Sequence, residues 1–388
     1  MYKAINRKIV SVVVCLLLLS SIVCLPPPGK AEAAEMAGLT AAKGCGLANL
    51  ALRWSNKIKK VYAQKYNNQK EVLGYYTKDW ATDNLSQNSL QAKADKITGI
   101  ATFSYQVTST GQINGKIPAQ ALETAWDNNI ETLALIHNLS SSGFDRNLIH
   151  SILSNPKLRT ETISNIYKTL LKHSFDGVNI DFENIPAEDR QNLNSFMMEL
   201  SDKLHKDGFK VTISVPAKTS DSPNSGWGAA FDYKKLAQAA DRIMLMTYDE
   251  HYFGGAPGPV ASTPWVEKVI VYASQVIPKD KLILGIGNYG YDWVVSRGGY
   301  RSVPSRSAIT LAEKYKAAIK WDNENQTPYF YYWDSKGQHV VWFESTSSAA
   351  FKLDLVNTYD LKGIAIWRLG FEAPEFWNTV EAKLNGKK

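Results

Sequence analysis

Cysteine is scarce in this sequence of 388 residues, with only Cys15, Cys24 and Cys45 present. The first two fall in an N-terminal apolar segment that we expect to be removed, which leaves Cys45 alone in the mature chain. One cysteine cannot form an internal disulfide, so the stability of an exported chain of this length must come from a large hydrophobic core.

The sequence also lacks the spacing of a metal site. Its six histidines are scattered, and none forms a ligand pair at helix or strand spacing, so we expect no metal and no other cofactor. No nucleic-acid-binding motif is present either, and nucleic acid is not an expected partner of an exported chain.

The N-terminus has the pattern of a secretory signal peptide, predicted over residues 1–33. Three basic residues (Lys3, Arg7, Lys8) precede an apolar run over residues 9–25. Prolines at 26–28 end this run, and Ala31-Glu32-Ala33 offers a small-x-small cleavage site. We therefore expect a secreted or cell-envelope-associated protein. An uncleaved membrane anchor is the alternative; a lipoprotein is disfavoured because Val23 precedes Cys24.

The mature chain is basic, most of all at its start. Four basic residues (Lys3, Arg7, Lys8, Lys30) and one acidic residue (Glu32) leave with the signal, which reduces the formal net charge from +7 to +4. Between Met36 and Lys70, within the segment 34–71, there are seven basic residues and no acidic one, and the apolar residues repeat at helical spacing. This segment is predicted to be a helix that packs on the main domain; alternatively, it is attracted to an anionic cell wall or membrane surface.

From residue 72 to about 384, short apolar runs alternate with helical patterns. Eight runs are strand candidates: Val72–Thr77, Ile97–Tyr105, Thr132–Asn138, Gly177–Glu183, Lys210–Ala217, Arg242–Asp249, Lys281–Tyr289 and Gly363–Leu369. Most are continuously hydrophobic, as strands buried on both faces are. The number of strands predicts an α/β fold in the form of a (β/α)₈ TIM barrel, with a doubly wound open sheet as the alternative. We expect the protein to be a monomer.

One stretch breaks the alternation, between the seventh and eighth strands. Residues 296–345 contain a helical pattern over Ile309–Ile319, followed by two aromatic or β-branched runs that flank Asp334-Ser335-Lys336-Gly337. The runs are typical of a hairpin. We predict a small α+β insertion at the top of the barrel.

The fourth strand contains three carboxylates within the short sequence DGVNIDFEN. Alternation places Val178, Ile180 and Phe182 toward the helices, and Asn179, Asp181 and Glu183 toward the barrel axis, with Glu183 nearest the C-terminal rim. Asp176 has the other parity and is expected to form structural hydrogen bonds.

Asp181 and Glu183 are two residues apart on one face, roughly 6.5 Å between Cα atoms. Carboxylates on one strand reach the same side of a sugar, whereas an ordinary retaining glycosidase uses opposite sides. Asp181 is therefore better suited to polarising a group on the substrate. An N-acetyl group on C2 is such a group, because its carbonyl oxygen can attack the anomeric carbon.

The stretch Phe175–Glu183 resembles the strand-four signature of glycoside hydrolase family 18, the chitinase-like family. Met246-Thr247-Tyr248-Asp249 on the sixth strand is similar to the family's Met-x-Tyr-Asp, Trp367 on the eighth is similar to the Trp beneath the sugar, and the insertion matches the family's α+β subdomain. The resemblance covers residues 72–384. It implies that Glu183 is the acid, that Asp181 orients the acetamido group, and that Tyr248 hydrogen-bonds its carbonyl. Asn179, Met246, Asp249, Tyr289 and Trp367 are implied to bind substrate.

Departures from the common family pattern narrow the substrate. Asn179 stands where many chitinases have Asp, and the Ser-x-Gly-Gly usual on the third strand is replaced by LALIHNLSSSG. These and the loops after strands six to eight are similar to a branch with bacterial spore-cortex-lytic N-acetylglucosaminidases, which implies peptidoglycan as substrate. The wall-binding repeats frequent in that branch are missing from residues 34–71. A chitinase or chitooligosaccharidase, and a non-catalytic glycan-binding protein on the same barrel, are the alternatives.

Overall fold

The computed structural model describes residues 70–222, 226–295 and 298–385. The expected signal peptide, 1–33, and the basic segment 34–71, apart from its last two residues, lie outside the described residues. Across the part of the chain that is described, no helix is long and apolar enough to cross a membrane.

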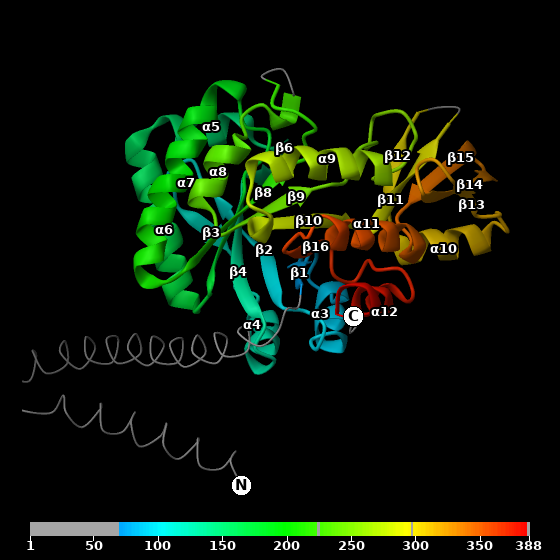
Figure 1. Ribbon diagram of the computed structural model, residues 1–388, viewed down its shortest axis with the longest axis horizontal. Helices are drawn as coiled ribbons and strands as arrows, with labels where there is room; N and C mark the ends of the chain where they lie inside the picture. Colours follow the sequence, from blue (N-terminus) through cyan, green and yellow to red (C-terminus); the bar gives the residue numbers. More distant parts are fainter. Residues whose placement is uncertain (1–69, 223–225, 296–297, 386–388) are drawn as a thin grey trace, which may run out of the picture. The chain divides into compact units, whose positions relative to one another are not determined.

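Eight parallel strands close into a barrel (Figure 1). They are β1 (Glu71–Tyr76), β2 (Gly99–Val107), β4 (Glu131–His137), β7 (Gly177–Asp181), β8 (Lys210–Pro216), β9 (Arg242–Met246), β10 (Leu282–Gly287) and β16 (Gly363–Trp367). The barrel is closed because β1 pairs with β2 on one side and with β16 on the other. The predicted (β/α)₈ barrel is confirmed, and every predicted strand overlaps one of these eight.

Helices cover the outside of the barrel. They are α3 (Leu85–Ala92), α4 (Ala119–Asp127), α5 (Arg146–Ser154), α6 (Pro156–His173), α7 (Arg190–Leu204), α8 (Tyr233–Ala239), α9 (Thr263–Val276), α11 (Thr346–Thr358) and α12 (Phe376–Val380). Local chemistry sets several starts: Asn155 caps α6, whose first residue is proline, and Ser262 caps α9. The periodic apolar residues of α7, from Leu193 to Leu204, are buried.

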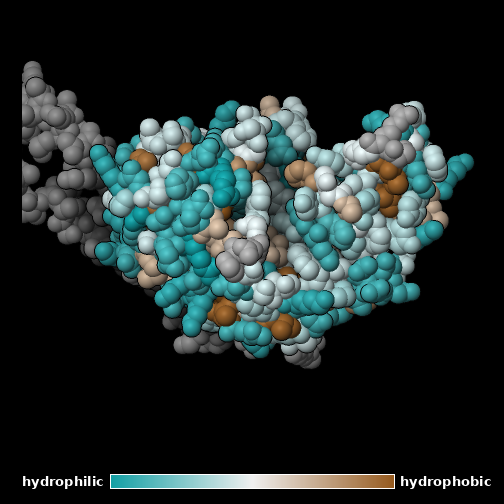
Figure 2. Space-filling model, turned by 90° about the horizontal axis from the view of Figure 1, so that it is seen from above, coloured by the Kyte–Doolittle hydropathy of each residue, from teal (hydrophilic) through white to brown (hydrophobic). Residues whose placement is uncertain are grey.

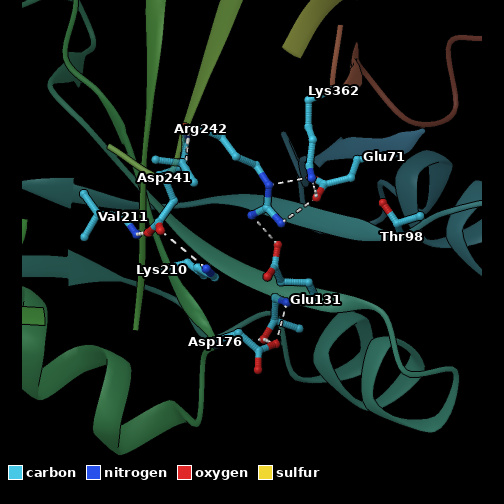
Figure 3. Close-up of polar contacts among 12 residues, drawn as sticks. Glu71, Thr98, Glu131, Asp176, Lys210, Val211, Asp241, Arg242 and Lys362 are labelled. Carbon is cyan, nitrogen blue, oxygen red and sulfur yellow. Dashed lines mark hydrogen bonds and ion pairs between the residues drawn. The ribbon is translucent and has the colours of Figure 1, made fainter. Parts of the chain in front are cut away.

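The N-terminal end of the barrel is closed by a buried ion cluster (Figure 3). Arg242, the first residue of β9, donates from Nη1 to Glu131 at 2.7 Å and from Nη2 to Glu71 at 3.1 Å. Glu71 and Glu131 are themselves the first residues of β1 and β4, and each of the three residues is less than 10% exposed. One guanidinium therefore joins three strands that are not neighbours in the sheet.

Asp176 belongs to the same end of the molecule (Figure 3). Its Oδ2 accepts hydrogen bonds from the backbone nitrogen and hydroxyl of Thr132, at 2.8 and 3.0 Å. This is the structural hydrogen bonding that was expected of the first acid in DGVNIDFEN.

The insertion begins earlier than the expected residue 296. Its five-stranded sheet has the order β12-β11-β15-β14-β13 and consists of β11 (Tyr289–Val294), β12 (Tyr300–Pro304), β13 (Lys320–Asp322), β14 (Thr327–Asp334) and β15 (Gly337–Phe343), with α10 (Ser305–Lys314) packed on one face. Since the apolar run of β10 continues into β11, hydrophobicity alone did not mark the boundary. The predicted hairpin is present, with Asp334 paired to Gly337. The surface in Figure 2 is indented between the lobe at right, which contains this sheet, and the main body.

We predict that Arg242→Ala lowers the free energy of unfolding by about 3–5 kcal/mol, because it removes the buried guanidinium that pairs with the carboxylates of Glu71 and Glu131. Lys383→Ala is the matched control: its pair with Asp354 is exposed (side chains 37% and 52%) and should contribute less than about 1 kcal/mol. Urea denaturation at pH 7 measures both. Equal losses in the two variants would contradict the importance of burial.

Candidate active site

The side chains of β7 divide between two cores. Val178, Ile180 and Phe182 belong to the large apolar cluster between the strands and the helices. A second cluster, which contains Leu135 and Met244, fills the barrel interior, and Asn179 faces it through a 3.4 Å contact from its Nδ2 to the sulfur of Met244. The alternation predicted for this strand is therefore confirmed.

Asn179 lies deeper in the barrel than a substrate-binding role requires. It is fully buried; its Nδ2 donates to Thr212 at 3.0 Å, and its Oδ1 accepts from Ser214 at 3.0 Å. Ser214 is in turn 2.9 Å from the hydroxyl of Tyr75. The amide of Asn179 is used in these contacts, below the C-terminal rim of the barrel. Strand parity gives the side of a residue but not its depth, and the substrate-binding role of Asn179 stays a prediction.

Asp181 lies above this network, at the C-terminal end of β7, and is only 4% exposed. Burial raises the pKa of Asp181 to about 7, and the nearby hydroxyl of Ser214 offsets part of the rise. A carboxyl with this pKa can exist in either protonation state near neutral pH.

Glu183 follows two residues beyond the end of β7 and is partly exposed. Asn138, at the end of β4, holds its backbone: the Oδ1 of Asn138 accepts from the nitrogen of Glu183, and the Nδ2 donates to its carbonyl oxygen, both at 2.9 Å. Asn138 itself is fully buried. The main chain of Glu183 is thus held by a residue next to the neighbouring strand β4, although the backbone pairing of β4 with β7 ends at Asp181.

Within the described residues, one side chain donates a hydrogen bond to the carboxyl of Glu183. The indole nitrogen of Trp227 donates to its Oε2 at 3.0 Å. Burial raises the pKa of Glu183 well above its ordinary value, the charges of Asp181 and Asp249 raise it further, and the Trp227 bond lowers it. The environment therefore favours the protonated carboxyl, the state needed to donate a proton.

Tyr248 and Asp249, in the loop that follows β9, form a second side of the candidate site, next to the acidic residues Asp181 and Glu183. Burial and the nearby charges of Asp181 and Glu183 raise the pKa of Tyr248, so its hydroxyl remains a donor. Among the residues that the structure describes, that hydroxyl has no hydrogen-bond partner. Gly285 makes room for the ring, since a Cβ at this position would lie 3.0 Å from the Cε1 of Tyr248.

Asp249 is oriented by two tyrosines of the inserted sheet. Its Oδ1 accepts from Tyr289 and, at 2.8 Å, from Tyr291. Burial raises the pKa of Asp249, and the two hydroxyl donors lower it again. Tyr289, predicted to bind substrate, is only 5% exposed and uses its hydroxyl on Asp249, so it supports this side of the site from behind.

Trp367, at the end of β16, lies between the barrel interior and the inserted sheet. Its ring contacts Tyr75 and Phe103 edge-on, at 5.3 and 5.7 Å between centroids. Met246, at the end of β9, has the parity of the inward-facing Met244. Both predicted residues are partly exposed at the C-terminal rim, where a sugar can be reached.

Three contributing residues were not identified from the sequence: Asn138, Trp227 and Tyr291. Their signals were weak but present. Asn138 ends the apolar run of β4, and Trp227 stands between two glycines in the loop after β8. No group of three or more potential metal ligands occurs within residues 70–222, 226–295 and 298–385.

The family model for glycosyl hydrolases family 18 matches residues 71–372, which include every side of this site. The chain belongs to glycosyl hydrolase family 18. Family 18 members are glycosidases, and the paired carboxyls, the tyrosine and the tryptophan described above lie at the rim where barrel enzymes have their active sites.

Two proteins of Bacillus subtilis (strain 168) are similar to this chain. YdhD, named as a candidate sporulation-specific glycosylase, is 37% identical over 277 residues, which are 70% of this chain and 66% of that protein. A protein named cortical fragment-lytic enzyme is 29% identical over 309 residues, 78% of this chain and 72% of its own length.

Solved structures show the same relationship. The spore cortex-lytic enzyme SleL of Bacillus megaterium QM B1551 superposes with a TM-score of 0.75 and 29% identity, over 82% of this chain and 75% of that one. A chitinase from Chromobacterium violaceum gives a TM-score of 0.76 at 29% identity, over 82% of this chain and all of the other. This family 18 glycosidase is therefore related to both spore cortex-lytic enzymes and chitinases.

We predict that Asp181→Asn lowers the pKa of Glu183. The charge of Asp181 is the largest cause after burial that raises this pKa, so its removal makes ionisation of Glu183 easier. Carboxyl ¹³C NMR on glutamate-labelled protein, with the signal assigned by Glu183→Gln, measures the shift. Asp354→Asn, at an exposed ion pair on α11, should leave the titration unchanged. A Glu183 pKa that stays or rises in Asp181→Asn would contradict the coupling.

Proposed function

We propose that this glycosidase cleaves N-acetylglucosamine linkages in peptidoglycan by a retaining mechanism in which the substrate's acetamido group is the nucleophile. The observation that carries the mechanism is the acidic pair at the C-terminal end of β7. Burial favours the protonated form of Glu183, and its nearest acidic neighbour in sequence, Asp181, is the last residue of the strand, two residues earlier and of the same parity.

In the first step, Glu183 donates its proton to the glycosidic oxygen as the C1–O bond breaks, and the bonding electron pair stays with that oxygen. The acetamido carbonyl oxygen bonds to C1 and forms an oxazolinium ion, whose N–H charge faces the Asp181 carboxylate. The free hydroxyl of Tyr248 donates to the acetamido oxygen and orients it. Trp367 stacks beneath the sugar ring, since pyranose faces pack on aromatic faces.

In the second step, Glu183 is a carboxylate and accepts a proton from water as the water oxygen attacks C1. The oxazolinium ring opens, the acetamido group is restored, and two inversions at C1 give net retention. Asp249, oriented by Tyr289 and Tyr291, remains in this proposal a contact for the sugar.

Peptidoglycan is favoured by the names of two relatives, the cortical fragment-lytic enzyme and SleL. The formal charge of +4 on the proposed mature chain also favours an anionic wall polymer over neutral chitin, a modest effect because the Debye length is about 8 Å at physiological ionic strength. In this proposal, residues 1–33 direct export, the protein acts as a monomer at the cell envelope, and the basic segment 34–71 contributes to wall association.

Chitin oligomers are the second candidate substrate. The observation that favours them is the superposition on the Chromobacterium violaceum chitinase over that protein's whole length. A non-catalytic glycan-binding role is disfavoured by Glu183, which keeps both its carboxyl and an environment that protonates it.

The mechanism predicts that a thiazoline analogue of N-acetylglucosamine inhibits competitively and that the first product keeps its anomeric configuration. Proton NMR of early product reads the anomer directly. Glu183→Gln is the matched control; it should retain binding of the thiazoline but turn over at least ~10²-fold more slowly. An inverted product, or a sugar covalently trapped on Asp181, would rule the mechanism out.

The substrate prediction is that a peptidoglycan tetrasaccharide is cut with a higher kcat/KM than the matched chitin tetrasaccharide. Muramic sugars carry a bulky lactyl ether, and the loop after β9 is rich in Gly and Pro, which leaves room beside the site. Mass spectrometry of the reducing-end sugar identifies the bond. If the chitin tetramer is better by tenfold or more, about 1.4 kcal/mol in transition-state binding, chitin replaces peptidoglycan as the substrate.

A further inference from the structure

Trp227 is a partly exposed aromatic residue whose polar atom is committed to the candidate acid. It lies in the short turn Gly226–Gly228, after β8, with 46% of its surface exposed. Its indole nitrogen nevertheless donates to the Oε2 of Glu183 at 3.0 Å. This contact comes from the segment that follows β8, the neighbour of β7 on one side, while Asn138, which follows β4 on the other side, holds the main chain of Glu183.

The ring of Trp227 is held as well. Phe144, in the two-residue strand β6 (Gly143–Phe144), contacts it edge-on at 6.4 Å between centroids, with 82° between the planes. The carbonyl oxygen of Phe144 accepts from the side chain of Asn184 at 3.1 Å, next to Glu183 in sequence. Asn184, the residue after Glu183, thus helps to hold Phe144, whose ring packs against Trp227.

The direction of the hydrogen bond has a chemical consequence. An indole N–H is a donor and has no lone pair with which to accept. When Glu183 is protonated, its carbonyl oxygen is a better acceptor than its hydroxyl oxygen, so the bond from Trp227 favours Oε2 as the carbonyl oxygen. The acidic proton is then favoured on Oε1, to which no side chain of the described residues donates.

We propose that Trp227 is a positioning residue that keeps the transferable proton of Glu183 on Oε1, directed at the glycosidic oxygen. The proposal rests on the proposed function of Glu183 as the acid. In the proton transfer, the Oε1–H bond breaks, a bond from hydrogen to the glycosidic oxygen forms, and the resulting carboxylate keeps its hydrogen bond from Trp227.

The same bond acts on the ionisation of the acid. A donor to a carboxylate stabilises the charged form, and Trp227 lowers the pKa of Glu183 against burial and the charges of Asp181 and Asp249. Its loss should raise this pKa. The acid would then hold its proton to higher pH but point it less reliably at the leaving group.

The test replaces Trp227 with 3-benzothienylalanine, which keeps the two-ring shape but has sulfur in place of N–H, and also with phenylalanine. Carboxyl ¹³C NMR should show the pKa of Glu183 raised by on the order of one pH unit in both variants. Trp333→Phe is the matched control, because Trp333 is 67% exposed on β14, and it should leave the titration unchanged. This readout requires no turnover, so it tests the contact even if the proposed function fails.

Kinetics then tests positioning. With a chitin or peptidoglycan oligosaccharide, whose leaving sugar needs a proton, kcat/KM at neutral pH should fall at least about tenfold in the benzothienyl variant. With 2,4-dinitrophenyl N-acetylglucosaminide, whose phenolate leaves without a proton, it should stay within about twofold of the wild type. Equal losses on both substrates would indicate simple packing and overturn the proposal, as would an unchanged Glu183 pKa. A wild-type protein inactive on every substrate would instead overturn the function proposed for Glu183.

Discussion

Burial of the Asp181 carboxyl inside a closed barrel is the constraint on which the rest of the site depends. A buried carboxyl resists ionisation, so its charge state becomes sensitive to each neighbouring group. The hydroxyl of Ser214 lowers its pKa, and any charge that Asp181 carries raises the pKa of Glu183. The two acids therefore differ in chemistry because one lies inside the barrel and the other lies just beyond the strand.

The groups around the acidic residues hold them in position and leave their protons available for the reaction. Asn138 binds only the main chain of Glu183, and Tyr289 and Tyr291 bind Asp249 from the inserted sheet. These contacts come from segments far apart in the sequence, and each uses a hydrogen bond rather than a charge. Rigid neutral partners can hold acidic groups close together without neutralising them.

Much of this arrangement follows from sequence pattern. Eight apolar runs predicted the barrel, and the alternation Val178, Asn179, Ile180, Asp181 predicted which side chains face the axis, because period two is a property of every strand. Pattern could not give depth, and Asn179 lies beneath Asp181. Sequence pattern also could not predict the role of Trp227. The residue lies in a loop without periodicity, and it contacts Glu183, 44 residues away in the sequence, only once the chain has folded. The start of the insertion was missed at Tyr289 because only Asn288 separates the apolar residues of β10 from those at the start of β11.

The ion cluster at the other end of the barrel bears on the order in which the chain folds. Arg242 is separated by 171 residues from Glu71 and by 111 from Glu131, and β1 meets β16 only when Glu71 pairs with Gly363. Contacts between such distant residues form late and slow the folding of a domain. Until the eighth strand arrives, both edges of the incomplete sheet remain unpaired, and such edges are open to association with other chains. The time that an unfinished molecule spends in an aggregation-prone state is therefore set by the closing strand pair, far from the residues that act on the sugar.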